Sequence, residues 1–201
     1  MKDRKSETKR DNHTFTRAKM HVIRRVRWEK PDTCWVKLNY DGSSRKNPGV
    51  ADSGGLIRNE KGEWICGFAK KIGITTRFTA ELWGLRDGLL QCLNLNLSSV
   101  LIELDAKAIV DLLANPDYSN NVISPLVDDC RFLMAQLLRV QVRHYFQKAN
   151  RCANALARLR SEQSSDFLLF NCPPVDIVDF FNFDANGLYL SRLCPEPVFS
   201  L

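Results

Sequence analysis

Hydrophobic residues follow a strand-like pattern in the first third of the chain. Residues 34–40 are rich in aromatic and branched apolar side chains, which favour a β-strand. Two further short strands are predicted over residues 54–58 and 64–68, on either side of the turn-forming sequence Asn-Glu-Lys-Gly. The three segments together predict a β-meander.

The period changes after the third strand. Apolar residues recur at intervals of three and four over residues 77–95 and predict a helix, and the apolar run at 100–104 predicts a buried strand. The remaining pattern predicts helices over 106–113, 121–138 and 149–160, and a strand over 140–146. The order βββαβααβα predicts an α/β fold, a mixed five-stranded sheet with helices packed on it.

Charge divides the chain of 201 residues into three parts. The whole chain carries a formal charge of +6, of which residues 1–30 contribute +7 and residues 161–201 contribute −5. We therefore expect a basic arm without regular structure over 1–30, a domain over 31–163, and an acidic, aromatic tail over 164–201. A domain of this size can bury its own core.

Several classes of protein are excluded or disfavoured by composition. No apolar run approaches the roughly 18–20 residues that span a bilayer, and the N-terminus lacks the apolar stretch of a secretory signal. The seven cysteines form no CxxC pair, which favours reduced thiols in a core over a zinc site or disulfides. We expect an intracellular, reducing location, nuclear or cytoplasmic rather than organellar.

Three carboxylates stand at the ends of predicted elements. Asp41 lies near the end of the first strand, Glu81 lies early in the long helix, and Asp105 follows the strand at 100–104. Each alone would also suit a cap or a solvated charge, but such ends can meet at one edge of a sheet, where the carboxylates would need cations. Oxygen ligands favour Mg²⁺ or Mn²⁺ over zinc, and two such ions about 3.5–4 Å apart serve phosphodiester hydrolysis.

Four segments around these residues carry a resemblance to a known family: NYDGSSRKNPGVADSGGLIRNEKGEW, TAELWGLRDGLLQC, VLIELDAKAIVDLL and ANRCANALARL. With them, the chain resembles ribonuclease H type 1 domains over about residues 35–160. More narrowly, it resembles plant ribonuclease H-like proteins related to the reverse-transcriptase polyproteins of non-LTR retrotransposons. The tail CPPVDIVDFFNFDANGLYLSRL also matches these proteins.

The resemblance implies an endonuclease that hydrolyses the RNA strand of an RNA–DNA hybrid with two Mg²⁺ ions, leaving a 5′-phosphate and a 3′-hydroxyl. Asp41 matches the aspartate that bridges both metals, and Glu81 and Asp105 match carboxylates that each hold one. No membrane partner is expected.

Nucleic acid is expected to contact two groups of residues. In related domains the loop after the first strand contacts nucleic acid, and here the candidates are Gly42, Ser43, Ser44 and Asn47. Lys70, Lys71 and Arg77, close in sequence to Glu81, could meet phosphates, or could equally form a solvated surface. The extended basic protrusion of some ribonucleases H is not apparent, so binding of the hybrid is expected to involve other surfaces. The arm residues Arg24, Arg25 and Arg27 are candidates.

The family pattern breaks at the fourth carboxylate. In the family it lies on the last helix, four residues after an Asn; here Asn150 is in place, but the fourth position is Asn154. The amide keeps a carbonyl oxygen and loses a negative charge, so Asn154 is expected to be a weakened catalytic ligand. Two alternatives to an enzyme stay open: a nucleic-acid-binding module without turnover, and an interaction protein whose tail aromatics, Phe180, Phe181 and Phe183, dock a partner.

Overall fold

The computed structural model describes residues 21–115, 123–145, 147–159 and 166–195. Its elements are β1 (His21–Val26), β2 (Val36–Ser44), β3 (Gly49–Arg58), β4 (Trp64–Thr75), α1 (Arg77–Asn94), β5 (Ser99–Leu104), α2 (Lys107–Ala114), α3 (Ser124–Ala135), β6 (Arg139–His144), the 3-10 helix η1 (Gln147–Ala149), α4 (Arg151–Leu156), β7 (Phe167–Phe170), α5 (Val175–Ala185) and β8 (Leu190–Pro195).

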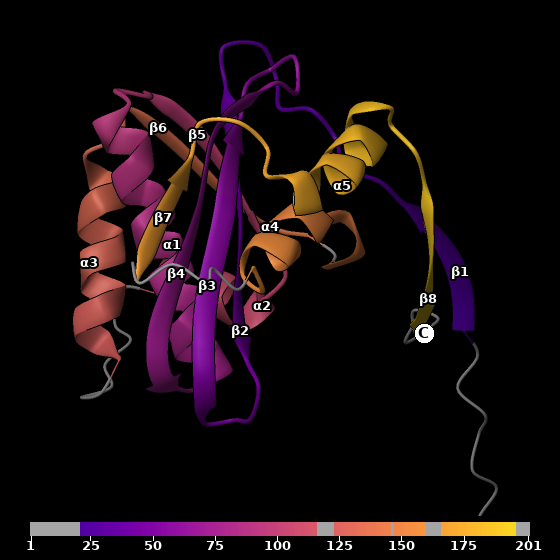
Figure 1. Ribbon diagram of the computed structural model, residues 1–201. Coiled ribbons are helices and arrows are strands. Elements are labelled where there is room, and N and C mark those ends of the chain that lie inside the picture. The colour runs from indigo at the N-terminus through magenta and orange to yellow at the C-terminus, as the bar shows by residue number, and fades with distance from the viewer. Residues whose placement is uncertain (1–20, 116–122, 146, 160–165, 196–201) are drawn as a thin grey trace, which may run out of the picture.

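A mixed sheet forms the centre of the fold (Figure 1). Within the described residues it has six strands in the order β6-β5-β2-β3-β4-β7. β5 is parallel to β2 and β6, whereas β3 is antiparallel to β2 and β4. The predicted α/β fold is confirmed. The sheet has one strand more than predicted because the apolar segment Phe167–Phe170, assigned from sequence to the tail, pairs with β4.

The alternation of side chains along β2 gives this strand one apolar and one polar side, and next to the polar side Leu56 of β3 packs in a second apolar cluster with α4 and α5. Leu38 and Tyr40 are fully buried on the face covered by α1, where the helix approaches them at Gly88 and Gly84. The helix begins where the sequence predicted, because the Thr76 hydroxyl accepts a hydrogen bond from the N–H of Thr79 at 3.1 Å. Figure 1 shows α1 and α3 on this side of the sheet, and α4 and α5 on the other.

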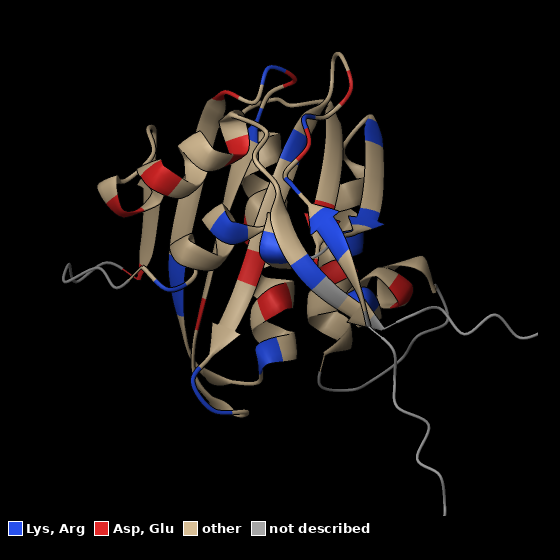
Figure 2. Ribbon diagram, turned by 90° about the vertical axis from the view of Figure 1, so that its right-hand side faces the viewer, with Lys and Arg blue, Asp and Glu red and all other residues tan. Residues whose placement is uncertain are grey.

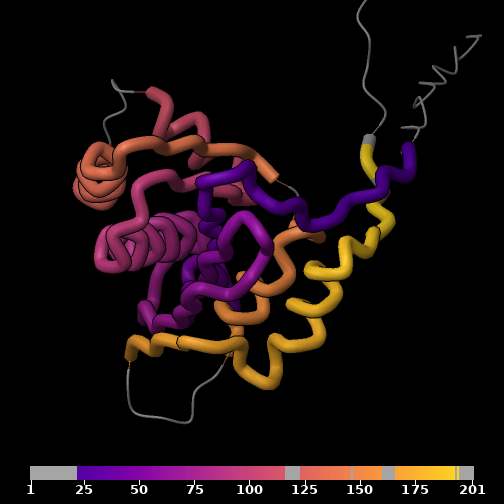
Figure 3. The backbone as a smooth tube through the Cα atoms, turned by 90° about the horizontal axis from the view of Figure 1, so that it is seen from above, coloured from indigo at the N-terminus to yellow at the C-terminus, as the bar shows by residue number. Residues whose placement is uncertain are grey.

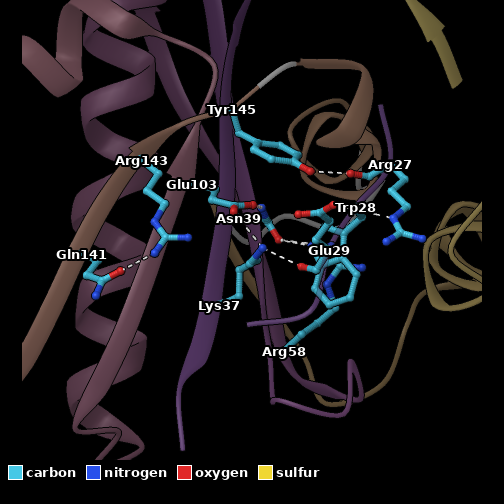
Figure 4. A network of polar contacts seen from close by, with 10 residues as sticks. All are labelled: Arg27, Trp28, Glu29, Lys37, Asn39, Arg58, Glu103, Gln141, Arg143 and Tyr145. Atoms are coloured by element: carbon cyan, nitrogen blue, oxygen red, sulfur yellow. Dashed lines mark hydrogen bonds and ion pairs between the residues drawn. The ribbon is translucent and has the colours of Figure 1, made fainter. Parts of the chain in front are cut away.

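The opposite face of the sheet carries buried polar side chains (Figure 4). Lys37 Nζ lies 2.7 Å from the carboxylate of Glu103, and both side chains are almost fully buried. The amide oxygen of Asn39 accepts hydrogen bonds from Trp28 Nε1 at 2.8 Å and from Arg58 at 3.1 Å. Buried charges and amides are costly unless they are paired, so this face needs a polar cover.

The described part of the expected basic arm supplies that cover. Residues 21–30 were predicted to lack regular structure, and this prediction is wrong for the part described: His21–Val26 form β1, and Trp28 is 3% exposed. The Arg58 guanidinium stacks 3.6 Å from the centre of the Trp28 ring, and Lys37 Nζ donates to the backbone oxygen of Glu29 at 2.6 Å. The segment is ordered because it satisfies polar groups that belong to the sheet.

The described part of the tail also packs on the domain. Asp184 of α5 forms a buried ion pair with Arg58 of β3 at 3.0 Å. The Phe181 ring packs edge-on against Trp64 at 5.7 Å, and the Arg151 guanidinium lies over the other two tail phenylalanines, Phe180 and Phe183. The aromatic residues considered for partner docking therefore contact the chain's own fold.

β1 and β8 pair with each other in an antiparallel ribbon separate from the main sheet. Seen from above, this ribbon projects from the body of the domain (Figure 3). It joins the first and last described segments of the chain, which the charge pattern had assigned to different parts.

Smaller differences from the predictions lie at helix ends. The helix predicted over 121–138 is Ser124–Ala135, with Pro125 in its first turn, where its missing N–H costs little. The helix predicted over 149–160 is divided into η1 and the short α4. All seven cysteines are free, and five are buried. Among the described residues, no helix is long and apolar enough to cross a membrane.

Candidate metal centre

Three acidic side chains meet at one edge of the sheet. Asp41 lies within β2, Asp105 directly follows the parallel strand β5, and Glu81 lies in the second turn of α1. One carboxylate oxygen of each lies within 4.8 Å of the others. Because β2 and β5 run in the same direction, their carboxyl ends share this edge, and α1 brings Glu81 to it.

Two glycines allow the close packing that forms the site. A Cβ on Gly42 would lie 2.2 Å from the backbone nitrogen of Glu81, so α1 crosses β2 in direct backbone contact. A Cβ on Gly54 would lie 2.4 Å from the backbone nitrogen of Ala157, so the end of α4 is equally close to β3. Any side chain at either position would push a helix, and with it a site residue, away from Asp41.

Asn154 also reaches this cluster. Its Nδ2 donates to Asp41 Oδ2 at 2.7 Å. The start of α4 is fixed by Asn150, whose buried Nδ2 donates to the backbone oxygen of Tyr40 at 2.7 Å, one residue before Asp41. The structure thus brings Asn154 to the other three candidate ligands, as a hydrogen-bond donor to the first of them.

The carboxylates are held in an environment that disfavours their charge. Asp41 is 1% exposed and Glu81 2% exposed. Burial, together with the charge of Asp105, raises the pKa of Asp41 from 3.8 to about 6, and burial with the charge of Asp41 raises the pKa of Glu81 well above its ordinary value.

Several carboxylate oxygens at this edge lack hydrogen bonds. Within the described part of the chain, Asp41 Oδ1 and both oxygens of Glu81 are buried and accept none. Buried, unsatisfied oxygen atoms of negative charge fit a hard divalent cation, which prefers carboxylate ligands. The residues present therefore suit Mg²⁺ or Mn²⁺.

Arg77 supplies positive charge to the same cluster. Its guanidinium lies 3.9 Å from Asp41, 3.7 Å from Glu81 and 3.7 Å from Asp105, and the side chain is half-exposed. The backbone N–H of Arg77 donates to the amide oxygen of Asn47 at 3.0 Å, which anchors the start of α1 to the loop after β2. Arg77, considered from sequence as a phosphate contact, thus faces the acidic residues.

Gly42, Ser43 and Ser44, which were expected in the loop after the first strand, are instead the last residues of β2, and the two serines form internal contacts. Ser43 Oγ donates to the backbone oxygen of Ala157 at 3.1 Å, and Ser44 Oγ donates to that of Thr75 at 3.3 Å. Both serines line an open pocket of about 310 Å³ beside the carboxylates, together with Arg45. Their remaining hydroxyl lone pairs can still accept hydrogen bonds from a ligand.

The structure places Lys70 and Lys71 away from the carboxylates. Lys70 Nζ pairs with Asp87 at 3.0 Å and lies over the ring of Trp83; Asp87 is six residues along α1 from Glu81. Lys71 lines a separate pocket with Asp166. Neither residue joins the cluster around Asp41.

Two residues near the site were not among the candidates from the sequence. His144, expected inside a strand, is the last residue of β6, and its Nε2 lies 3.1 Å from the backbone oxygen of Asp105. Arg158, which had no role in the motif, lines the same small pocket as Asp41, Arg77 and Asn154. Its spacing of four residues after Asn154 was the available signal, since residues that far apart share a helix face.

Comparison with known proteins identifies the family and the fold of the chain. The model of a family described as reverse transcriptase-like matches residues 39–160. An Arabidopsis thaliana protein named "putative ribonuclease H protein" is 35% identical over 166 residues, which are 83% of this chain. The chain spans only 27% of that protein's length.

Solved ribonuclease H structures share the fold. The N-terminal ribonuclease H domain of a Mycobacterium tuberculosis protein is 25% identical, with a TM-score of 0.59 over 62% of this chain and 91% of that one. Ribonuclease H1 of Halobacterium salinarum is 23% identical, with a TM-score of 0.58 over 62% and 95%. LC11 ribonuclease H1, solved with an RNA/DNA hybrid, is 23% identical, with a TM-score of 0.56 over 61% and 94%. The chain thus belongs to the reverse transcriptase-like family and has the ribonuclease H fold.

Proposed function

We propose that this chain is a divalent-metal-dependent nuclease that hydrolyses the RNA strand of an RNA–DNA hybrid. The observation that carries the proposal is the convergence of Asp41, Glu81 and Asp105, with buried oxygens that lack hydrogen bonds, at the edge of a ribonuclease H fold. The name of the Arabidopsis relative and the hybrid bound to LC11 ribonuclease H1 support the choice of substrate.

In this proposal Asp41 would hold both Mg²⁺ ions, and Glu81 and Asp105 would each hold one. When bound, the ions would activate a water molecule and stabilise the leaving 3′-oxygen. The water oxygen would bond to phosphorus as the bond from phosphorus to the 3′-oxygen breaks, with one water proton released to solvent and one proton taken up by the 3′-oxygen, which yields a 5′-phosphate and a 3′-hydroxyl. Ser43 and Ser44 would contact the strand beside the cut.

Asn154 and Arg77 set the charge of the site. Three carboxylates and the guanidinium leave two negative charges, which one divalent ion balances. A second ion then depends on Asn154, whose amide must rotate to present its oxygen instead of its nitrogen. Arg77 is half-exposed, so it is free to move from the carboxylates to a phosphate when cations bind.

A second candidate is a nucleic-acid-binding module of the same fold with little or no turnover. It is favoured by the same two contacts: Asn154 donates to Asp41, and Arg77 bridges all three carboxylates. In that case the acidic cluster is neutralised by the protein's own groups.

A cleavage assay separates the two candidates. Purified protein is incubated with a hybrid labelled on the RNA strand, with Mg²⁺ and with Mn²⁺, beside the Asp41→Asn and Asn154→Asp variants. The nuclease proposal expects cleavage by the wild type, loss with Asp41→Asn and a gain with Asn154→Asp. Cleavage only after Asn154→Asp would establish the binding module instead, and cleavage unaffected by Asp41→Asn would reject this site.

A further inference from the structure

A basic groove leads away from the carboxylates between α4 and α5. It is an open hollow of about 700 Å³, and its lining includes the cations Lys148, Arg151 and Arg158 against one acid, Asp176. Lys148 and Arg158 are exposed, whereas Arg151 is half-buried. Lys148 belongs to η1, Arg151 is the first residue of α4, and Arg158 follows the end of α4, and all three line this one hollow.

The groove is continuous with the metal centre at one end. Asn154 and Arg158 line both the groove and the small pocket that contains Asp41. Arg158 also lines the pocket of Ser43 and Ser44. A polymer held with one phosphodiester at Asp41 can therefore continue into the groove.

At its other end the groove meets the β1–β8 ribbon. Gln147 and Lys148 line both the groove and a neighbouring hollow of about 580 Å³, which is completed by Ile23, Ser191 and Arg192. Lys148 Nζ donates to the backbone oxygen of Ser191 at 2.6 Å, which joins η1 to the ribbon. Figure 2 faces the ribbon and shows Lys and Arg on both of its strands.

An aromatic ring lies among the cations. Phe180 lines the groove, and the Arg151 guanidinium lies 4.5 Å from the centre of its ring. Guanidinium planes and aromatic rings stack on nucleobases. Such stacking needs a base whose face is open, which a single strand offers and the interior of a duplex does not.

We propose that this groove binds the single-stranded continuation of the RNA strand that the metal centre cuts. The inference rests on the proposed function for the identity of that strand. Lys148, Arg151 and Arg158 contact successive phosphates, and Phe180 with Arg151 provides the stacking surface. The β1–β8 ribbon extends the same basic track outward, which gives a role to the two segments that lie outside the family match at residues 39–160.

The test measures binding without cleavage, by fluorescence anisotropy in metal-free buffer. The full chain is titrated with a blunt hybrid and with the same hybrid whose RNA strand extends by about ten nucleotides at its 5′ or its 3′ end, a length within known single-strand site sizes. One of the two extensions is expected to raise the affinity about tenfold. It should also steepen the slope of log K against log salt by about 2, because each of three phosphate contacts contributes about 0.7.

Matched variants locate the effect. The double variant Arg151→Glu, Arg158→Glu should abolish the gain in affinity that the extension gives. The control double variant Lys30→Glu, Lys61→Glu makes the same charge change on exposed residues outside the groove and should preserve that gain. Should the double groove variant fail to fold, Lys148→Glu alters an exposed side chain and should lower the slope gain by about a third.

Three outcomes would overturn the proposed role of the groove. They are that neither extension changes the affinity or its salt dependence, that the groove and control variants behave alike, or that polyglutamate competes as well as single-stranded RNA. The nuclease proposal is tested separately with the blunt hybrid and Mg²⁺. Cleavage without a gain from either extension rejects only the groove, and a gain that the groove variants remove, without cleavage, rejects only hydrolysis.

Discussion

Introducing a carboxylate at position 154 should make the stability of this protein depend more strongly on metal, and on pH above about 6, than that of the wild type. In the wild type, Asn154 Nδ2 donates to Asp41 Oδ2 at 2.7 Å. The Asn154→Asp variant replaces that donor by a second negative charge beside a carboxylate that is 1% exposed. Without metal the two charges repel, and with Mg²⁺ they become joint ligands.

The size of the effect follows from the pKa of Asp41. Two like charges about 4 Å apart repel by roughly 4 kcal/mol at an effective dielectric constant near 20. A proton can relieve this, because the pKa of Asp41 is already raised to about 6 and a protonated Asp41 can donate to the new carboxylate. Protonation costs about 1.4 kcal/mol per pH unit above that pKa. Relative to the wild type, we expect the free energy of unfolding of the variant to be lower by about 1.4 kcal/mol at pH 7, by about 2.7 kcal/mol at pH 8 and almost unchanged at pH 5.

Urea unfolding in EDTA at these three pH values measures the loss, and repetition with Mg²⁺ measures the rescue. Mg²⁺ at a hundred times its Kd should stabilise the variant by about 2.7 kcal/mol, and the wild type by less. Asn96→Asp is the matched control, since Asn96 is exposed and follows the far end of α1, about 20 Å along the helix axis from Glu81.

Two results would refute this reasoning. A variant as stable as the wild type in EDTA at pH 8 would mean that residue 154 does not share the environment of Asp41. Equal stabilisation of variant and wild type by Mg²⁺ would mean that residue 154 is not a ligand position.

Three further predictions test the buried charges and the close packing in and around the site. In metal-free buffer the free energy of unfolding of the wild type should fall by about 3 kcal/mol as the pH rises from about 4 through 6. The reason is that Asp41 binds its proton more tightly in the folded state, where its pKa rises from 3.8 to about 6, and Glu81 acts in the same direction. Urea titrations should show a smaller pH dependence in Asp41→Asn, and a flat wild-type profile would contradict the prediction. Gly42→Ala should destabilise the fold by about 3 kcal/mol and weaken Mn²⁺ binding measured by calorimetry, since its Cβ would lie 2.2 Å from the Glu81 backbone; unchanged Mn²⁺ affinity would show that α1 can shift without moving Glu81. Asp184→Asn should lower the free energy of unfolding, measured in urea, by about 3–5 kcal/mol because it leaves the Arg58 charge buried and unpaired. A decrease below about 1 kcal/mol would mean that water reaches Arg58.

Local sequence patterns accounted for most of the fold. The helical spacing after Arg77 predicted α1 to within a residue of its end, and the apolar run before Asp105 predicted β5. The helix could be predicted because its apolar side chains repeat with the helical period, and the strand because it is a short continuous apolar run. The arm and the tail were misjudged because the groups that order them belong to other parts of the chain. Trp28 bonds to Asn39, and Asp184 to Arg58, 126 residues earlier.

For the site, the sequence by itself determined which residue types are present, and the resemblance to ribonucleases H implied a carboxylate where this chain has Asn154. Motif spacing identified Asp41, Glu81 and Asp105, because each stands at a fixed place relative to a strand or helix end. Only the tertiary structure decided that their oxygens lie within 4.8 Å, that Arg77 faces all three, and that Lys70 does not join them. Those facts depend on how closely helices cross strands at Gly42 and Gly54. Contact between distant segments is set by packing, which one-dimensional spacing does not encode.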